Sequence, residues 1–187
     1  VETGTYQPVM VNGKLRIPTI FKMSPLFKEL HTIEIVKDIH VNSVNFVDDD
    51  ENPYKNHSKK INFILGDSQK ELKYVCEKIK EPAVFYLDGH FSADWNGVTT
   101  GKSDNTDVPL YEELKIINDN FKHKAIVICD DLRLFGDKFK HGDWTHITKD
   151  GVKKMVKDRL INSFGNSVPD DSPWGMDSLI LELKEID

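Results

Sequence analysis

Two short apolar runs that end in acidic residues constrain the fold more than any other feature of this chain. The runs cover residues 84–87 and 125–129, and they stop at Asp88 and at the pair Asp130-Asp131. Short apolar runs closed by polar turns are typical of strands buried on both faces, and helical segments between such strands favour a parallel sheet. Because ligands of parallel sheets bind beyond the carboxyl ends of the strands, we expect three carboxylates to meet at one edge of the sheet.

Three neighbouring carboxylates predict a metal site. Carboxylates that lie close together repel one another unless one takes up a proton or a cation lies among them. A cluster of oxygen ligands suits a hard divalent ion such as Mg²⁺, Mn²⁺ or Ca²⁺. The alternative for Asp130 and Asp131 is that one carboxylate caps the following turn while the other is solvated. The two strand ends together favour a metal site formed by Asp88, Asp130 and Asp131.

Composition limits the class of protein. A chain of 187 residues, 39% of them hydrophobic, suits a single globular domain over 1–187. The net charge of -6 argues against a nonspecific nucleic-acid binder. Both cysteines, Cys76 and Cys129, lie within apolar patterns, as expected for core thiols in a reducing compartment. No signal peptide and no apolar run of spanning length is visible, so we expect a soluble cytoplasmic protein without a membrane span. Its first residue is Val1 in a strand-like stretch, which leads us to expect a domain cut from a longer chain.

The chain alternates strand-like and helix-like stretches. The predicted strands cover the start of the chain and residues 31–35, 61–65, 84–87, 125–129 and 178–183, with a short partner of the last strand near 166–168. The predicted helices lie around 17–22, at 37–47, from 68 to 79, from 109 to 121 and from 148 to about 163. Between them, the long polar segments 92–108 and 132–149 have the length of functional loops. This order predicts an α/β fold with a Rossmann-like, doubly wound, mostly parallel seven-stranded sheet and helices on both faces.

Three further strand ends carry residues suited to a nucleotide-like ligand. A turn with a single glycine, Gly4, follows the first strand, and Glu34 closes the second strand roughly thirty residues later. That is the spacing at which mononucleotide-binding folds place an acid that takes ribose hydroxyls. The third strand runs into Asp67 and Ser68, where a capping box begins a helix. For Glu34 and Asp67 the alternative is ordinary polar termination of a strand.

In this order the motifs resemble the class I S-adenosylmethionine-dependent methyltransferases, from Val1 to Leu183. The resemblance implies that the turn after the first strand holds the methionine part of the cofactor, that the acid ending the second strand holds the ribose, and that the acid after the third strand faces the adenine. The implied cofactor-binding residues are Glu2, Thr3, Gly4, Thr5, Glu34, Asp67, Ser68 and Asp88. The first turn has one glycine where the family usually has two or three.

The acids of the two central strands narrow the resemblance to metal-dependent sugar O-methyltransferases of the macrocin and novobiocin tailoring type. In that group an acid ending strand four and a pair of acids ending strand five bind the metal, which implies Asp88, Asp130 and Asp131 here. A polar residue two positions after the first acid acts as base, and this chain has His90 where the group usually has Asp. The implied catalytic residues are therefore His90 and Asp88. The region also resembles glycan-modifying methyltransferase domains of large viruses, which would place further glycan-synthesis domains in the parent chain.

These observations predict an S-adenosylmethionine-dependent O-methyltransferase that uses Mg²⁺ or Mn²⁺ and acts on a sugar or glycan hydroxyl. A metal coordinated by the acceptor hydroxyl and its neighbour would align the nucleophile and would favour vicinal hydroxyls. Few aromatic residues flank the acids, which favours a sugar over a catechol. An imidazole at His90 can accept a hydroxyl proton, or it can serve only as a hydrogen-bond partner in the loop.

Two other functions stay open. A nicotinamide-dependent dehydrogenase on a related fold would need a richer glycine pattern than Thr3-Gly4-Thr5. A methyltransferase-like binding module without chemistry would not need the acids or the polar residue at position 90. Three tryptophans in predicted loops either stack on a sugar face or cover the core: Trp95, Trp144 and Trp174.

Overall fold

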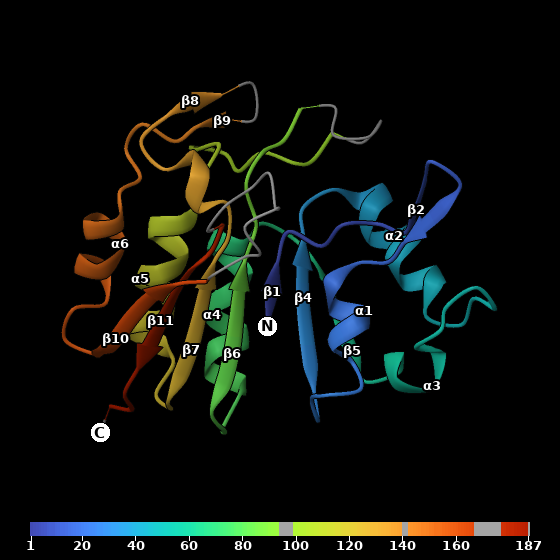
Figure 1. The fold of residues 1–187 in the computed structure, drawn as a ribbon. Coiled ribbons are helices and arrows are strands. Elements are labelled where there is room, and N and C mark those ends of the chain that lie inside the picture. The colour runs from blue at the N-terminus through green and yellow to red at the C-terminus, as the bar shows by residue number, and fades with distance from the viewer. Residues whose placement is uncertain (94–98, 140–141, 167–176, 187) are drawn as a thin grey trace.

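A seven-stranded sheet organises the chain. The structure, a computed structural model, describes residues 1–93, 99–139, 142–166 and 177–186. The sheet has the strand order β10-β11-β7-β6-β1-β4-β5 (Figure 1). The strands are β1 (Glu2–Thr3), β4 (Leu30–Glu34), β5 (Ile61–Leu65), β6 (Ala83–Leu87), β7 (Ala125–Cys129), β10 (Leu160–Gly165) and β11 (Leu179–Leu183). Neighbouring strands are parallel across β5, β4, β1, β6 and β7, whereas β11 is antiparallel to both of its neighbours. The predicted doubly wound, mostly parallel seven-stranded sheet is confirmed.

Helices lie on both faces of this sheet, as predicted. They are α1 (Thr19–Met23), α2 (Lys37–Phe46), α3 (Lys55–Ser58), α4 (Ser68–Lys78), α5 (Leu110–Asn120) and α6 (Lys149–Met155), with a short 3-10 turn η1 (Leu132–Leu134). In Figure 1, α4 and α5 lie behind the sheet and α1 lies in front of it. None of the helices in the described residues is long and apolar enough to cross a membrane.

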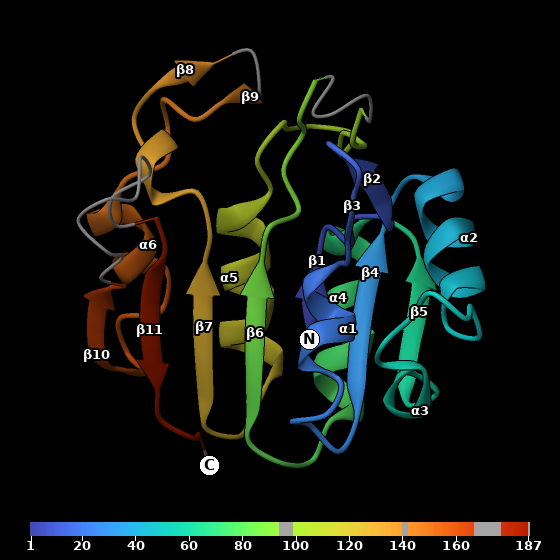
Figure 2. The same ribbon diagram turned by 45° about the vertical axis from the view of Figure 1, so that its right-hand side comes forward.

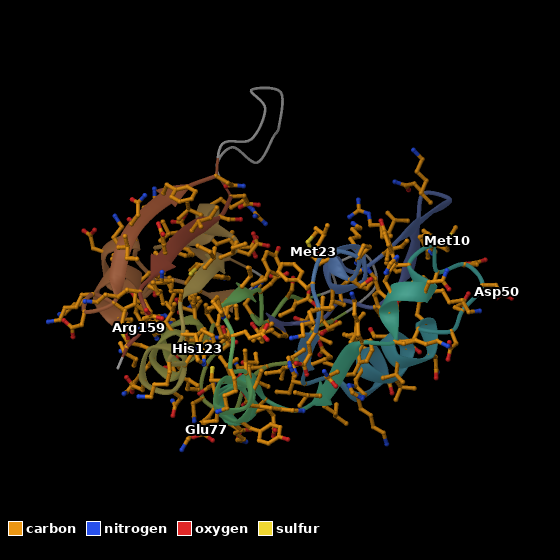
Figure 3. The ribbon with its side chains drawn as sticks, turned by 90° about the horizontal axis from the view of Figure 1, so that it is seen from below. Met10, Met23, Asp50, Glu77, His123 and Arg159 are labelled. Atoms are coloured by element: carbon orange, nitrogen blue, oxygen red, sulfur yellow. The ribbon has the colours of Figure 1, made fainter. Side chains whose placement is uncertain are left out.

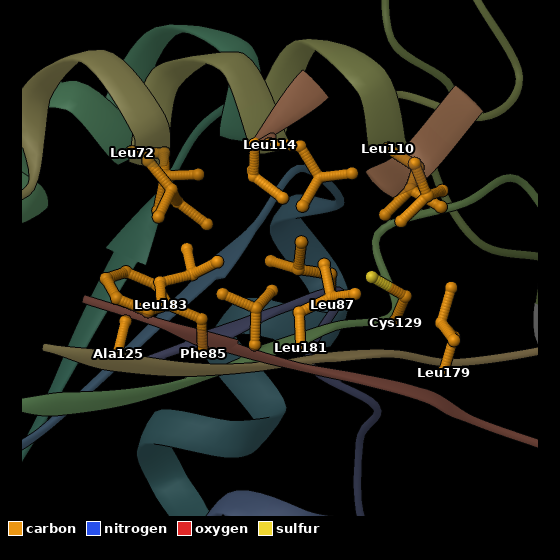
Figure 4. Close-up of a cluster of buried hydrophobic side chains, with 14 of the residues drawn as sticks. Leu72, Phe85, Leu87, Leu110, Leu114, Ala125, Cys129, Leu179, Leu181 and Leu183 are labelled. Carbon is orange, nitrogen blue, oxygen red and sulfur yellow. The ribbon is translucent and has the colours of Figure 1, made fainter. Parts of the chain in front are cut away.

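The larger apolar core lies between the sheet and α4, α5 and α6. Apolar residues at helical spacing turn one face of α5 toward the strands, so that Leu114 and Ile117 are fully buried. Alternation along β6 directs Phe85 and Leu87 into the same layer (Figure 4). Each such side chain stabilises the fold by about 1.5–3 kcal/mol. The carboxyl ends of the central strands are therefore held by a well-packed layer.

A smaller core lies on the opposite face, where α1 and α2 cover β4 and β5. Phe21 of α1 and Phe46 of α2 meet edge to face, with ring centroids 5.2 Å apart. On this face Figure 2 shows no helix in front of β6 and β7 among the described residues. Tyr86 and Ile128, which point to this side, are accordingly only half-buried. Among the described residues, α4, α5 and α6 cover one face, whereas on the other face helices cover only the β4 and β5 half.

A hairpin that was not predicted follows the first strand. Its strands β2 (Val9–Val11) and β3 (Lys14–Arg16) pair antiparallel. Asn12 and Gly13 join them with φ angles of 51° and 74°. This dipeptide is a strong hairpin signal, because both central residues of the turn need positive φ. The short helix predicted around 17–22 is present as α1 after the hairpin.

The stretch after Thr148 differs from its prediction. Thr148 caps α6 by accepting a hydrogen bond from the amide of Gly151, but α6 ends at Met155. Residues 160–165 instead form β10, which pairs with β11. The predicted helix end near 163 is therefore wrong. The last strand pairs with residues 160–165 and not with the predicted partner near 166–168. Residues 167 and 168 lie outside the described residues. A free strand edge supplies backbone hydrogen-bond partners, so tertiary pairing outweighed local helix propensity here.

A buried arginine fastens the end of α5 to the edge of the sheet. Arg159 is 2% exposed. Its guanidinium donates hydrogen bonds to the carbonyl oxygens of Ile117, Phe121, His123 and Lys184, at 2.7–3.1 Å. Figure 3, seen from below, labels Arg159 beside His123. A positive group at the last carbonyls of α5 also complements the helix dipole.

Candidate active site

One cleft of about 980 Å³ opens at the carboxyl ends of the parallel strands. The strand order reverses between β1 and β6, and open α/β sheets bind ligands in the crevice at that point. Six of the predicted cofactor-binding residues line this cleft: Gly4, Thr5, Glu34, Asp67, Ser68 and Asp88. The other two, Glu2 and Thr3, are buried in β1 and do not line it.

The turn after β1 explains the single glycine. Gly4 has a φ of 77°, and a Cβ added there would lie 2.2 Å from the carbonyl oxygen of Asp88. Any side chain at this position would collide with backbone, so the close approach of β1 and β6 requires glycine. Beneath the turn, Glu2 accepts a hydrogen bond from the Thr32 hydroxyl at 3.1 Å. Burial raises the pKa of Glu2 to about 8, so this carboxyl supports the turn in its neutral form.

Glu34 and Asp67 line the part of the cleft at the ends of β4 and β5. Glu34 is 5% exposed and accepts a hydrogen bond from the amide of Val36 at 2.7 Å. Burial raises the pKa of Glu34 to about 7. Asp67 is the N-cap of α4, because its carboxylate accepts from the amide of Gln69 at 3.0 Å. The cap of this helix is therefore Asp67, whereas the capping box had been predicted to begin at Ser68.

The described part of the long segment 92–108 closes over this half of the cleft. Ser103 donates a hydrogen bond to Asp67 at 3.1 Å, and Lys70 pairs with Asp104 at 2.7 Å. A Cβ at Gly101 would lie 1.9 Å from the side chain of Ile35, so the backbone packs directly on the residue after Glu34. The expectation that this segment is more than a plain connection agrees with its place over the cleft.

His90 lies between two of the predicted metal ligands. Its Nδ1 lies 3.4 Å from Asp88 and its Nε2 lies 3.0 Å from Asp131. Asp131 itself has a φ of 57°, which is uncommon for a residue other than glycine. This strained turn points the Asp131 carboxylate back at His90. Asp88, His90 and Asp131 offer ligand atoms within 4.8 Å of one another.

Asp130 is held away from that group. Its carboxylate accepts hydrogen bonds from the hydroxyls of Tyr86 and Ser178, the latter at 3.1 Å. Among the described residues Asp130 falls in a second close group, with Asp131 and Asp177. The three acids predicted to share one ion thus line one cleft, but they do not form one close group in the structure.

An arginine occupies the second acidic group. The guanidinium of Arg133 lies 2.5 Å from Asp131 and also contacts both carboxylate oxygens of Asp177. Its positive charge compensates Asp177 and in part Asp131, whereas Asp88 has no lysine or arginine partner among the described residues. The group of Asp88, His90 and Asp131 is therefore the less compensated of the two. Arg133 falls in the predicted long loop 132–149, and no role was predicted for it. The available signal was an arginine two positions after a pair of acids at a strand end.

Positive charge compensates the acids of the cleft only in part. Among the described residues Arg133 and His90 lie beside Asp131, whereas Asp88 has His90 alone. Burial raises the pKa of Asp88 to about 6 against the lowering effect of His90, and the charges of Asp130 and Asp131 add to the rise. Burial also raises the pKa of Asp131. Burial would lower the pKa of His90, but the hydrogen bond to Asp88 and the nearby carboxylates outweigh it, and the pKa is raised. Such carboxyls are stabilised in their charged form by a bound cation, which is the behaviour of a site for a positively charged ligand.

The donor set fits a divalent metal ion. Two carboxylates and one imidazole within mutual reach are donors that Mn²⁺ accepts, and the carboxylates alone, with water, suit Mg²⁺. Trp144 packs against His90, one of these three residues, from the interior of the protein. Trp144 is 2% exposed, stacks on Phe135 and meets His90 edge-on, with ring centroids 5.0 Å apart. Trp144 therefore covers the core and supports His90, while Trp95 and Trp174 lie outside the described residues.

No protein-family model matches this chain, and no curated protein matches it. Solved structures match it in shape. The O-methyltransferase TomG of Streptomyces achromogenes, in complex with S-adenosylmethionine, has a TM-score of 0.58 at 13% identity, over 99% of this chain and 72% of that chain. The chain has the fold of a class I S-adenosylmethionine-dependent methyltransferase.

Two further solved structures with this methyltransferase fold are similar. A Bacillus cereus O-methyltransferase in complex with SAH has a TM-score of 0.56 at 10% identity, over 98% of this chain and 72% of that chain. The N-methyltransferase NodS of Bradyrhizobium japonicum has a TM-score of 0.52 at 9% identity, over 100% of this chain and 84% of that chain. The predicted resemblance to class I methyltransferases is confirmed at the level of the fold.

Proposed function

We propose that this chain transfers a methyl group from S-adenosylmethionine to a hydroxyl of a sugar or glycan, with the help of a divalent cation. The observation that carries the proposal is one cleft, at the point where the strand order reverses, that holds both predicted halves of a site. Gly4, Glu34 and Asp67 line one half, and Asp88, His90 and Asp131 line the other.

The cofactor half suits S-adenosylmethionine in shape and charge. Glu34 presents a carboxylate to ribose hydroxyls, and Gly4 and Thr5 of the turn after β1 line the cleft where the methionine part would lie. The cofactor supplies an electrophilic methyl on a positively charged sulfonium. The raised pKa values of Glu34 and Asp88 favour a cationic ligand, because a nearby positive charge stabilises both carboxylates.

In the acceptor half, His90 is proposed as the general base. Asp88 orients the ring through Nδ1, and the charge of Asp131 near Nε2 stabilises the imidazolium that forms when a hydroxyl proton is taken. Trp144 limits the movement of the ring from the other side. The base is thus held by three contacts in the mouth of the cleft.

We assign the proposed metal to Asp88 and Asp131 in place of the three acids predicted from the sequence. Asp130 is engaged by Tyr86 and Ser178, so its part is to fix the end of β7. A Mg²⁺ or Mn²⁺ ion at this place would lower the pKa of a coordinated hydroxyl and orient it. Acceptors with vicinal hydroxyls, such as sugars, would gain most from such an ion.

The structure argues against a dinucleotide oxidoreductase. Dinucleotide-binding folds place the pyrophosphate at the N-terminus of a helix that directly follows the first strand. Here a hairpin follows, and α1 begins only at Thr19 and has five residues. The binding-module alternative has no use for a buried histidine between two acids, and it is tested together with the metal.

Calorimetry and chelation test this function. S-adenosylmethionine should bind and NAD should not, with or without Mn²⁺. Methyl transfer from labelled S-adenosylmethionine to a panel of sugars should stop in EDTA and return with Mg²⁺ or Mn²⁺, while cofactor binding persists, because the cofactor contacts come from other strand ends. Full transfer in excess EDTA would remove the metal from the proposal, and absence of S-adenosylmethionine binding would remove the whole function.

A further inference from the structure

The hairpin β2–β3 forms a second hollow, separate from the chemistry of the cleft. The hollow has a volume of about 460 Å³ and lies between the hairpin and α1. Its charged lining residues are Lys14, Arg16 and Lys22, and no acid lines it. Figure 2 shows the hairpin above the carboxyl ends of β1 and β4, beside α2. The charged residues that line this hollow are thus all positive, although the net charge of the chain is -6.

The positive charge of this hollow is uncompensated within the described residues. Several other surface lysines pair with acids: Lys28 with Glu81, Lys55 with Asp50, Lys70 with Asp104, Lys102 with Asp107 and Lys115 with Asp119. Within 4.0 Å of Lys14, Arg16 or Lys22 no carboxylate of the described part of the chain forms such a pair. Three unpaired cations around one hollow are suited to an anion with more than one negative charge.

The hairpin holds these cations on a firm base. Lys14 and Arg16 are two residues apart on β3, so they project from the same face, about 7 Å apart along the strand. The alternate residues Leu15 and Ile17 also line the hollow, and they pack against the smaller core. The turn at its tip is the tight type that fixes the strand register. The cations therefore start from backbone positions that need little reorganisation when an anion binds.

The hollow adjoins the cleft. Arg16 lines both cavities, so a molecule bound in the cleft can extend past it. S-adenosylmethionine carries no phosphate, and its single carboxylate belongs with the methionine part near Gly4. A dianionic group in the hollow would therefore belong to the acceptor and not to the cofactor.

We propose that the β2–β3 hollow is a binding site for a phosphate group, and that this phosphate is carried by the acceptor. The guanidinium of Arg16 can hold two phosphate oxygens in a fork, while Lys14 and Lys22 add point charges. The proposal that the hollow binds phosphate depends only on the residues that line the hollow. The assignment to an acceptor rests on the proposed function, and it narrows the acceptor class to phosphorylated or nucleotide diphosphate-linked sugars.

Anion binding is tested without cofactor or acceptor. Inorganic phosphate and pyrophosphate are titrated into ¹⁵N-labelled protein, and the amide resonances of Asn12, Gly13 and Lys14 are followed. They should shift in a saturable manner. The double variant Lys14→Ala/Arg16→Ala should weaken binding by about tenfold or more, since it removes two charge-assisted contacts. The matched control is Lys154→Ala/Lys157→Ala, which removes the same charge from exposed positions around the end of α6, far from the hairpin in Figure 1.

Two results would overturn the phosphate site: shifts that do not saturate or are not localised to the hairpin, and an equal loss of affinity in the control variant. The acceptor part is tested by comparing a free hexose, a hexose phosphate and a nucleotide diphosphate hexose in the transfer assay. One phosphorylated form should have a KM at least about tenfold lower than the free sugar. An equal KM for the free sugar and both phosphorylated forms would overturn the acceptor assignment but not the phosphate site. Lack of S-adenosylmethionine binding would overturn the proposed function, whereas the phosphate titration would be unaffected.

Discussion

Single carboxyl groups in the cleft depart from their behaviour in water because the fold buries them before any ligand arrives. Glu34 is the clearest case, since its side chain lines the cleft and is 5% exposed. We expect Glu34→Ala to weaken S-adenosylmethionine binding by about 1.5–3 kcal/mol, the contribution of a hydrogen bond to a charged group. Titration calorimetry measures this, with Glu77→Ala on the exposed side of α4 as control. An unchanged affinity in Glu34→Ala would exclude this residue from the cofactor site.

The pKa of Glu34 also predicts a pH dependence of binding. Burial raises this pKa to about 7, so the free protein carries a neutral carboxyl there below pH 7. A cationic cofactor favours the charged form, and binding below pH 7 must therefore expel a proton. The affinity for S-adenosylmethionine should rise between pH 6 and 8, and Glu34→Gln should flatten this rise. A wild-type slope retained in Glu34→Gln would assign the dependence to another group.

His90 is the residue on which the proposed chemistry depends. His90→Ala should lower turnover by about 10²–10⁴-fold, the usual contribution of a general base, and should leave the affinities for cofactor and Mn²⁺ near wild type. Turnover is measured with saturating acceptor, and Mn²⁺ binding by electron paramagnetic resonance. Loss of Mn²⁺ binding would make His90 a metal ligand, and full turnover would make it structural.

At the scale of elements, the hydrogen bonds of Arg159 join α5, β10 and the end of the chain. Replacing it leaves buried carbonyl oxygens without donors, and each costs about 1–3 kcal/mol. We expect Arg159→Met to lower the free energy of unfolding by at least about 3 kcal/mol. Urea denaturation measures the change, with the exposed Lys157→Met as control. A loss below about 1 kcal/mol would show that water replaces the guanidinium there.

Over the whole molecule, buried acids make stability depend on pH. Burial raises the pKa of Glu2 to about 8, and those of Glu34 and Glu113 to about 7. A carboxyl group whose pKa is higher in the folded than in the unfolded protein stabilises the fold fully at pH values below its unfolded pKa, near 4.5. This stabilisation is lost as the pH rises through the pKa of the folded state. His31 acts in the opposite sense, because burial lowers its pKa.

Glu113 isolates this effect, since it is a buried residue of α5 and does not line the cleft. Between pH 5 and 7 the free energy of unfolding of Glu113→Gln should fall less steeply than that of the wild type, because one proton-linked group is missing. Urea denaturation at several pH values measures both slopes. Parallel curves for the two proteins would show that Glu113 does not change its ionisation on folding.

The sequence by itself determined the type of sheet and the edge that carries the site. The runs at 84–87 and 125–129, each ended by acid, are local patterns that mark buried strands and their ends, and the helical segment between them favours parallel pairing. The capped helix after Asp67 and the apolar stripe of α5 are likewise local, because they depend on spacing along one element. Because parallel strands end at one edge of a sheet, these features predicted that Glu34, Asp88 and Asp131 lie at the same edge, and the structure shows all three lining one cleft.

Tertiary structure alone decided which polar groups meet. Asp130 was predicted to share an ion with Asp88, but it turns to Tyr86 and Ser178. Ser178 lies 48 positions away along the chain, and no local pattern encodes that meeting. The same holds for β10, which took its place because β11 offered a free edge, and for the pairing of Arg133 with Asp177. Periodicity reports which face a residue takes, whereas the partner on that face depends on strand order, register and packing, which exist only in the folded chain.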